Sequence, residues 1–260
     1  LTEPGAGSDA AMQQTKAYLD GDHYVVNGRK CFITNAGEAK YYTTVVMTDK
    51  SKGNKGMSIL VIPADAPGLS IGKHEKKMGI RGSSTYELIF EDCRIPADSM
   101  LGVRGKGFPI AMHTLDGGRI GIASQALGLA EGALERTIEY TKERKQFGRT
   151  IAQQQNTQFQ LANMATKVEA AKNLVYKAAL KKQQFADGAR VSYSVEAAMA
   201  KLFAAEVAME VTTKCVQLFG GYGYIREYDV ERMMRDAKIT EIYEGTSEVQ
   251  RMVISGALLK

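Results

Sequence analysis

Leu101-Gly-Val-Arg-Gly-Lys-Gly107 is the stretch at which the pattern of this 260-residue chain changes. Its glycines interrupt the apolar periodicity found on either side. Before it, apolar residues fall in short runs rich in Val, Ile, Tyr and Thr, as in strands. After it, they recur every three or four residues, as in helices. The sequence therefore predicts an α+β architecture, with a β domain over residues 1–103 and a helical domain over residues 104–260.

The segment before these glycines predicts a small β-barrel or sandwich. Its apolar runs are separated by loops rich in Lys, Gly, Asp and Pro, a spacing typical of all-β domains. Asn27-Gly28 lies between the first two runs, and this dipeptide is a strong signal for a type I′ hairpin. The predicted strands cover residues 23–26, 30–34, 41–47, 58–62 and 86–90.

The segment after the glycines predicts an antiparallel four-helix bundle. Between Phe108 and Tyr140, only the residues 116–118 (Asp-Gly-Gly) break the helical pattern. Two further apolar stripes follow, and long helices with one apolar stripe pack side by side. The second stripe covers residues 195–218. The first comprises Phe159, Met164, Val168, Ala171, Val175 and Ala178.

Composition narrows the classes of function. Hydrophobic residues make up 44% of the chain and charged residues 24%, as in ordinary globular proteins. The net charge of +5 is spread along the chain and does not favour nucleic-acid binding. No run approaches the roughly 20 apolar residues of a membrane helix. Because the chain opens at Leu1 without a Met, we expect it to be a fragment.

Cysteine and histidine usage gives no sign of a metal site. Cys31, Cys93 and Cys215 are odd in number and lack the spacing of metal ligands. We therefore expect reduced thiols in the core. The three histidines are equally scattered, so no metal-binding cluster is predicted.

Gly5-Ala-Gly-Ser-Asp-Ala10 matches the G-x-G-x-x-A pattern of dinucleotide-binding loops. That pattern binds a dinucleotide only between an apolar strand and a helix. Here Thr-Glu-Pro precedes it, and residues 12–19 alternate like a polar strand. We therefore reject a nicotinamide site. A tight turn remains, either a simple β-turn or a cradle of backbone N–H groups for the polar edge of a cofactor.

Glu244 is the strongest candidate for catalysis. It lies in Ile242-Tyr-Glu-Gly-Thr-Ser-Glu248, at a glycine turn before a helix predicted to begin at Thr246 or Ser247. A carboxylate held in this way can act as a general base, or it can be a solvated partner of the helix dipole. The dipole lowers the pKa of Glu244 and burial raises it; burial is the larger effect, so we expect a stronger base once substrate excludes water.

Four segments, taken together, resemble the acyl-CoA dehydrogenase family and most closely its short-chain (butyryl-CoA) members. They are residues 1–9, 30–35, 144–148, and 217–223 running on to 234–246. The resemblance implies the family's middle β domain and C-terminal four-helix bundle, without its N-terminal helical domain. It also implies FAD-dependent α,β-dehydrogenation of short-chain acyl-CoA thioesters to trans-2-enoyl-CoA, with electrons passed to an electron-transfer flavoprotein.

The same resemblance implies the roles of individual residues. Glu244 would remove the α-proton, and its backbone N–H would bind the thioester carbonyl. Some branches of the family carry the base at the position of Gly118, which has no side chain here. Substrate contacts would come from Ser8, Asp116, Arg119 and Gly245, with Arg119 on the CoA moiety. Taken alone, Arg119 could equally be a charge on a helix surface.

FAD contacts are implied in three groups. The flavin would lie near the first loop and the strand carrying an aromatic residue at position 32, which could also be an ordinary core residue. A neighbouring subunit would hold the FAD tail with a second group, whose first segment could also be a plain helix C-terminus. The third group would contact the adenosine side. The residues near the flavin are Leu1, Thr2, Gly7, Ser8, Phe32, Ile33 and Thr34. Those on the FAD tail are Arg144, Gln146, Phe147, Gln217, Gly220 and Gly221, and those on the adenosine side are Thr246 and Glu248.

A cofactor site shared between subunits implies a homotetramer built as a dimer of dimers. The implied setting is fatty-acid β-oxidation, in the cytoplasm of a bacterium (preferred) or the mitochondrial matrix of a eukaryote. The alternatives are a family member with another chain-length or branched specificity, an oxidase that passes electrons to oxygen, an inert fragment, and a non-catalytic flavoprotein relative that binds nucleic acid.

Overall fold

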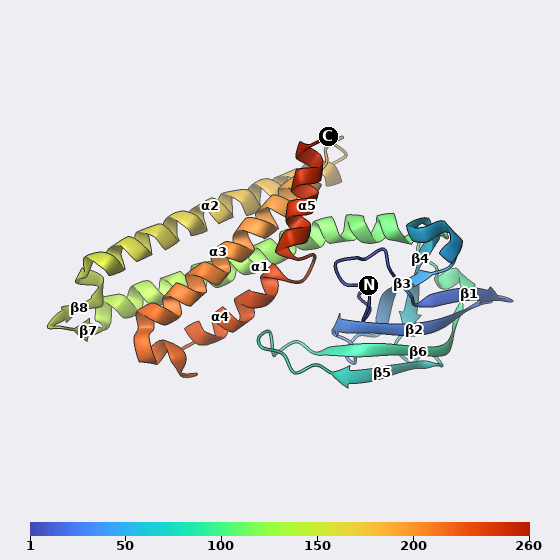
Figure 1. Ribbon diagram of the computed structural model, residues 1–260, viewed down its shortest axis with the longest axis horizontal. Helices are drawn as coiled ribbons and strands as arrows, with labels where there is room; N and C mark the ends of the chain where they lie inside the picture. The colour runs from blue at the N-terminus through green and yellow to red at the C-terminus, as the bar shows by residue number, and fades with distance from the viewer. The chain divides into compact units, whose positions relative to one another are not determined.

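The computed structural model describes all residues from Leu1 to Lys260. The chain divides into two compact units, the β unit (Leu1–Thr114) and the helical unit (Leu115–Lys260). Helix α1 (Gly107–Glu143) begins in the β unit and continues into the helical unit. The six strands of the main sheet precede the long helices along the chain (Figure 1), which confirms the predicted α+β architecture.

A single six-stranded mixed sheet forms the β unit. Its strand order is β4-β3-β1-β2-β6-β5, and neighbours are antiparallel except for β1 and β3, which are parallel. One face buries aliphatic and aromatic side chains such as Val26, Leu60 and Phe90. Ala111, near the start of α1, is buried against Met57 and its neighbours on β3 and β4. The strands are β1 (Lys16–Asp20), β2 (His23–Thr34), β3 (Tyr41–Met47), β4 (Met57–Pro63), β5 (Leu69–His74) and β6 (Thr85–Pro96), with 3-10 turns η1 (Lys50–Gly56) and η2 (Ala97–Ser99).

The predicted hairpin at Asn27-Gly28 is wrong. Strand β2 runs through both residues, and the turn lies instead at residues 21–22, between Asp20 and its partner His23. The register slips between Val26 and Gly28, so Asn-Gly forms a β-bulge. A side chain at Gly28 would place its Cβ 2.6 Å from the Cα of Thr15. Residues that tolerate a tight turn also suit a bulge, and the sequence alone does not separate the two.

The other predicted strands agree with the sheet in differing degrees. Residues 41–47 coincide with β3, and residues 58–62 and 86–90 fall inside β4 and β6. The polar strand expected over residues 12–19 starts only at Lys16. Strand β5 was missed because its apolar alternation covers only Leu69 and Ile71 before Gly72 interrupts it.

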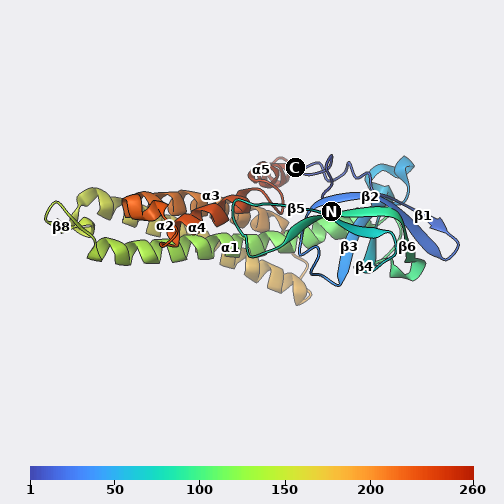
Figure 2. The ribbon, with the colours of Figure 1, turned by 90° about the horizontal axis from the view of Figure 1, so that it is seen from below.

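Long helices make up the helical unit. Helices α1, α2 and α3 lie alongside one another, as both ribbon views show (Figures 1 and 2), and their buried side chains share one core cluster. Two short strands join α1 to α2, and two short helices follow α3. These elements are β7 (Lys145–Gln146), β8 (Arg149–Thr150), η3 (Ile151–Gln153), α2 (Gln155–Ala186), α3 (Ser194–Phe219), η4 (Gly220–Tyr224), α4 (Val230–Lys238), η5 (Ile239–Glu241) and α5 (Ser247–Leu258).

The predicted stripe on α2 is buried from Met164 to Ala178. Phe159 is the exception, with 59% of its surface exposed. It lies five residues before Met164, which rotates it away from the stripe on a helix of 3.6 residues per turn. The facing side of α3 is rich in buried alanines, whose small side chains let neighbouring helices approach closely.

The three cysteines are free and buried, as predicted. Burial raises the pKa of the Cys93 and Cys215 thiols to about 11. None of the helices has both the length and the hydropathy that crossing a membrane requires.

Candidate active site

Glu244 lies in a turn between η5 and α5 whose backbone is left-handed at two successive residues. The φ angles are 54° at Glu244 and 86° at Gly245. For a residue other than glycine, this conformation has an energy cost of roughly 1–2 kcal/mol. Such strained residues concentrate at functional sites. Thr246 then caps α5, its hydroxyl accepting a hydrogen bond from the Val249 N–H at 3.4 Å. The predicted helix start is therefore confirmed.

The Glu244 carboxylate occupies the space beside Gly118 of α1. A Cβ at position 118 would lie 2.6 Å from its Oε2, so a side chain there is incompatible with the carboxylate in this place. Burial raises the pKa of Glu244 above its usual value, and the charges of Arg119 and Lys201 oppose that rise without cancelling it. The carboxyl is thus a stronger base than an exposed glutamate.

Arg119 is buried rather than on a helix surface, so the surface-charge interpretation is wrong. Its guanidinium donates a 2.6 Å hydrogen bond to Oδ1 of Asp116, one turn earlier on α1. Asp116 also accepts a 2.5 Å hydrogen bond from the Ser194 hydroxyl at the start of α3. The Nε of Arg119 is buried without a partner, and a buried donor in that state commonly marks a ligand or water position.

Two residues that sequence reasoning missed hold the turn in place. Lys201 of α3 is fully buried, and its Nζ donates to the Gly245 carbonyl at 2.8 Å. Gln250 of α5 donates to the same carbonyl at 2.8 Å and to the Glu244 carbonyl at 3.1 Å. A signal was available for Lys201, because it stands between Ala197 and Ala204 in the apolar stripe of α3.

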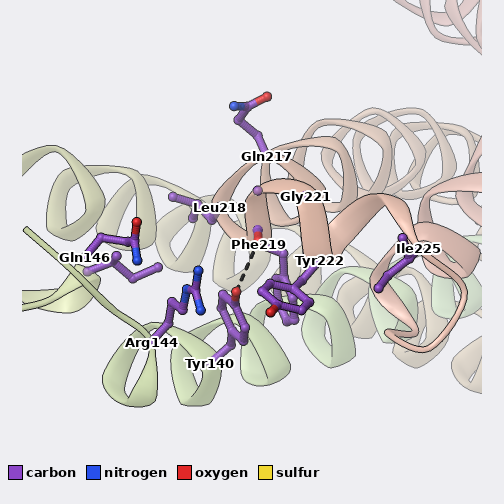
Figure 3. Close-up of a pocket in the computed structure, with 11 residues that line it drawn as sticks. Tyr140, Arg144, Gln146, Gln217, Leu218, Phe219, Gly221, Tyr222 and Ile225 are labelled. Carbon is purple, nitrogen blue, oxygen red and sulfur yellow. Dashed lines mark hydrogen bonds between the residues drawn. The ribbon is translucent and has the colours of Figure 1, made fainter.

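A cavity of about 510 Å³ lies where the C-terminal ends of α1 and α3 meet. Figure 3 shows the side chains of Tyr140, in the last turn of α1, and of Arg144, directly after α1, directed toward the end of α3 and the glycines that follow it. The structure brings together in this cavity all but one of the residues predicted for the FAD tail. They are Arg144, Gln146, Gln217, Gly220 and Gly221.

Aromatic packing fixes the walls of this cavity. The Tyr140 ring stacks on Phe219 at 4.0 Å between centroids, and its hydroxyl donates to the Phe219 carbonyl at 3.2 Å (Figure 3). The Arg144 guanidinium lies 5.1 Å from the centre of the Tyr222 ring. Gly220 has a φ of 62°, and a Cβ there would meet nothing within 4 Å. The glycines leave open backbone beside the Arg144 cation, and a guanidinium next to accessible backbone suits a phosphate group.

The remaining predicted residues of the helical unit lie outside this cavity. Phe147 sits at the turn between β7 and β8, with a φ of 52° and 94% of its surface exposed. Glu248 is exposed on the first turn of α5, next to the capping residue Thr246. No group of three His, Cys, Asp or Glu side chains is placed to hold a metal ion.

In the β unit, a buried ion pair attaches the first loop to strand β2. Lys30 donates to Oε1 of Glu3 and to Oε1 of Gln13, both at 2.6 Å, and to the Leu1 carbonyl at 3.2 Å. The Cys31 N–H donates to the Thr2 carbonyl at 3.0 Å. Leu1 and Thr2 are therefore fixed beside the strand that carries Phe32, Ile33 and Thr34.

The rest of that loop is a tight turn, as predicted, closed by hydrogen bonds between Glu3 and Ala6 of 3.2 and 3.0 Å. Gly7 and Ser8 follow it and are exposed.

Phe32 is an exposed aromatic on a bulge of β2. The register slips between Lys30 and Ile33, and Phe32 adopts a φ of 55° with 64% of its surface exposed. The bulge turns its ring out of the sheet core, so the interpretation of Phe32 as a core residue is wrong. Ile33 packs against the core and Thr34 is exposed. An exposed ring on a strained backbone position is suited to stacking on a planar ligand.

These features define a class of protein. The chain belongs to the acyl-CoA dehydrogenase family: residues 1–93 match the family's middle domain and residues 105–259 its C-terminal domain. It is 60% identical over 260 residues to the short-chain specific acyl-CoA dehydrogenase of Clostridium acetobutylicum, covering 100% of this chain and 67% of that protein.

Among solved structures, butyryl-CoA dehydrogenase from Megasphaera elsdenii is 56% identical with a TM-score of 0.97. A chain from a structure of the electron transferring flavoprotein of Acidaminococcus fermentans is 57% identical, also with a TM-score of 0.97. This chain is covered completely in both cases and spans 67% of each.

Proposed function

We propose that the protein catalyses α,β-dehydrogenation of short-chain acyl-CoA thioesters, with Glu244 as the base that removes the α-proton. The observation that carries the proposal is the Glu244 turn. The turn combines left-handed backbone, a carboxylate in the space left by Gly118, and a pKa raised by burial. A base whose pKa moves toward working pH is matched to proton abstraction. The identity to short-chain specific relatives supports the chain length.

The residues present fit FAD as the cofactor. Phe32 offers an exposed ring for a flavin. The cavity beside Arg144 combines a cation with glycine backbone that no side chain covers, which suits a pyrophosphate. When bound, FAD would supply the acceptor for the hydride that leaves the β-carbon.

The chain's own residues would perform the remaining work. Glu244 accepts the α-proton at its carboxylate, and its backbone N–H stabilises the negative charge that develops on the thioester oxygen. Lys201 and Arg119 favour the ionised carboxylate before substrate binds. Arg119, whose buried Nε has no partner, would bind the CoA moiety with Asp116 holding its guanidinium.

We further propose that the cavity beside Arg144 serves a neighbouring subunit in a dimer of dimers, with Phe147 completing it. A phenylalanine that is 94% exposed at the tip of a hairpin is suited to contact a second chain or its ligand. The likeness to a chain from an electron transferring flavoprotein structure supports such a flavoprotein as the electron acceptor.

The decisive experiment is anaerobic titration of the FAD-loaded protein with butyryl-CoA, followed by visible absorption. We expect the flavin band to bleach in the wild type and to persist in Glu244→Gln, which keeps the shape of the side chain but cannot accept the proton. Full bleaching of Glu244→Gln would overturn the assignment of the base. Faster bleaching with octanoyl-CoA or isovaleryl-CoA would overturn the short-chain assignment.

A further inference from the structure

Lys201 is the one lysine of the helical unit that is completely buried. Burying an ammonium group costs several kcal/mol of folding free energy unless the charge is compensated. An apolar side chain of similar size at this position would avoid that cost. The ammonium donates to a backbone carbonyl, that of Gly245, rather than to a carboxylate. Fold stability alone therefore does not account for a lysine at this position.

The carbonyl that Lys201 binds belongs to the turn that carries the candidate base. Gly245 follows Glu244 directly, and both are left-handed. The same carbonyl also accepts a hydrogen bond from Gln250, and a Cβ at position 245 would lie 2.8 Å from the Gln250 amide nitrogen. Donors from α3 and α5 thus converge on one oxygen and hold a strained turn that glycine alone can complete.

Lys201 also acts on Glu244 through its charge. The groups that act on Glu244 within the helical unit are Arg119 of α1 and Lys201 of α3, and both favour the carboxylate. Lys201 in turn is influenced by Arg119, Glu241, Glu244 and Glu248; burial is the largest effect and lowers its pKa to about 8. The two side chains are therefore coupled, and each stabilises the charged form of the other.

We infer that Lys201 is a positioning residue for the base, fixing the Glu244–Gly245 turn through the Gly245 carbonyl and supporting the ionised carboxylate through its charge. This inference rests on the proposed function. Gln250 shares the first of these roles and not the second, because its amide is neutral. The pair therefore offers a way to separate geometry from charge.

The first test compares Lys201→Met, Gln250→Met and Lys214→Met in the FAD-loaded protein, by the rate of flavin bleaching with butyryl-CoA from pH 5 to 9. Lys214 lies on the same helix in a partly exposed ion pair with Glu210, so its variant should match the wild type. Lys201→Met should lower the maximal rate about tenfold or more, the size of one hydrogen bond from a charged group. It should also move the acid side of the pH–rate profile (the acid limb) upward by about one pH unit, because a nearby positive charge that favours the carboxylate is lost. Gln250→Met should lower the rate and leave the limb in place.

A wild-type rate together with an unshifted limb in Lys201→Met would overturn the inference. So would an equal shift of the limb in Gln250→Met, because the shift would then come from a disturbed turn.

The second test needs neither flavin nor a substitution at position 201. In protein labelled with ¹³C-lysine, the Lys201 Cε resonance should titrate with a lowered pKa, and Glu244→Gln should lower that pKa further. An unchanged Lys201 pKa in Glu244→Gln would refute the coupling. If the wild type does not bleach at all, the proposed function fails, and this titration still decides whether Lys201 and Glu244 interact.

Discussion

Gly118→Ala is the sharpest test of the space that the active-site carboxylate occupies. The new methyl carbon would lie 2.6 Å from Oε2 and 3.0 Å from Cδ of Glu244. The closer distance is roughly 1 Å short of an ordinary van der Waals contact. Because Gly118 lies inside α1, the backbone cannot withdraw easily, and the carboxylate must move instead. A displacement of about 1 Å in a reacting group can cost about 10²-fold in rate.

The same substitution should not harm folding. Replacing a glycine inside a helix by alanine typically stabilises the helix by about 0.5–1 kcal/mol. Gly121 provides the matched control, since it lies on the same helix and a Cβ there would meet nothing within 4 Å. We expect both variants to be at least as stable as the wild type in urea unfolding. Only Gly118→Ala should lose activity, by about 10²-fold in the rate of flavin bleaching with butyryl-CoA.

The result that refutes this reasoning is a Gly118→Ala protein with the wild-type rate and an intact fold. The carboxylate would then not need the space beside α1. A comparable loss of rate in Gly121→Ala would also count against it, because stiffening of the helix would explain both.

Three further predictions concern charges and thiols. The bleaching rate should fall as the pH decreases, and the midpoint of that fall should lie above pH 4.5. Burial raises the pKa of Glu244 from 4.5, and only the ionised carboxylate can accept a proton. A midpoint at or below pH 4.5 contradicts this prediction. Lys30→Met leaves the buried Glu3 carboxylate without the cation it pairs with, so the β unit should lose about 3–5 kcal/mol of unfolding free energy in urea. An equal loss in Lys16→Met, at an exposed site, would argue against this reason. Cys93 and Cys215 should resist iodoacetamide at pH 8 until denaturant is added, because thiols with pKa values of about 11 stay protonated at that pH. Prompt labelling of the folded protein contradicts this prediction.

Local patterns were sufficient for most secondary structure. The strand over residues 41–47 and the helix near residues 195–218 were predicted almost to the residue, because each is a continuous run with one period. Asn27-Gly28 failed because its backbone freedom serves a bulge as well as a hairpin turn. The backbone of Thr15 approaches Gly28 so closely that no side chain fits there, and the local sequence pattern does not show that contact.

The candidate site shows the same division. Sequence reasoning located Glu244 and noted the empty position at Gly118, but it could not show that the two meet. It left open whether Arg119 lies on a surface, and it missed Lys201 and Gln250. Each of these depends on which faces of α1, α3 and α5 come together. Helical periodicity in the sequence identifies the apolar face of each helix, but it does not say which helix packs against that face.

The sequence by itself determined the two periods of the chain, the glycine-rich change between them, and a glutamate at a glycine turn before a helix. Those features are local, since hydrophobic spacing, caps and turns act over a few residues. Only the tertiary structure decided that the glutamate is half-buried, that its carboxylate fills the space beside Gly118, and that a buried lysine holds its turn. A carboxylate's basicity depends on the solvent and charges around it, and helices distant in the chain supply both.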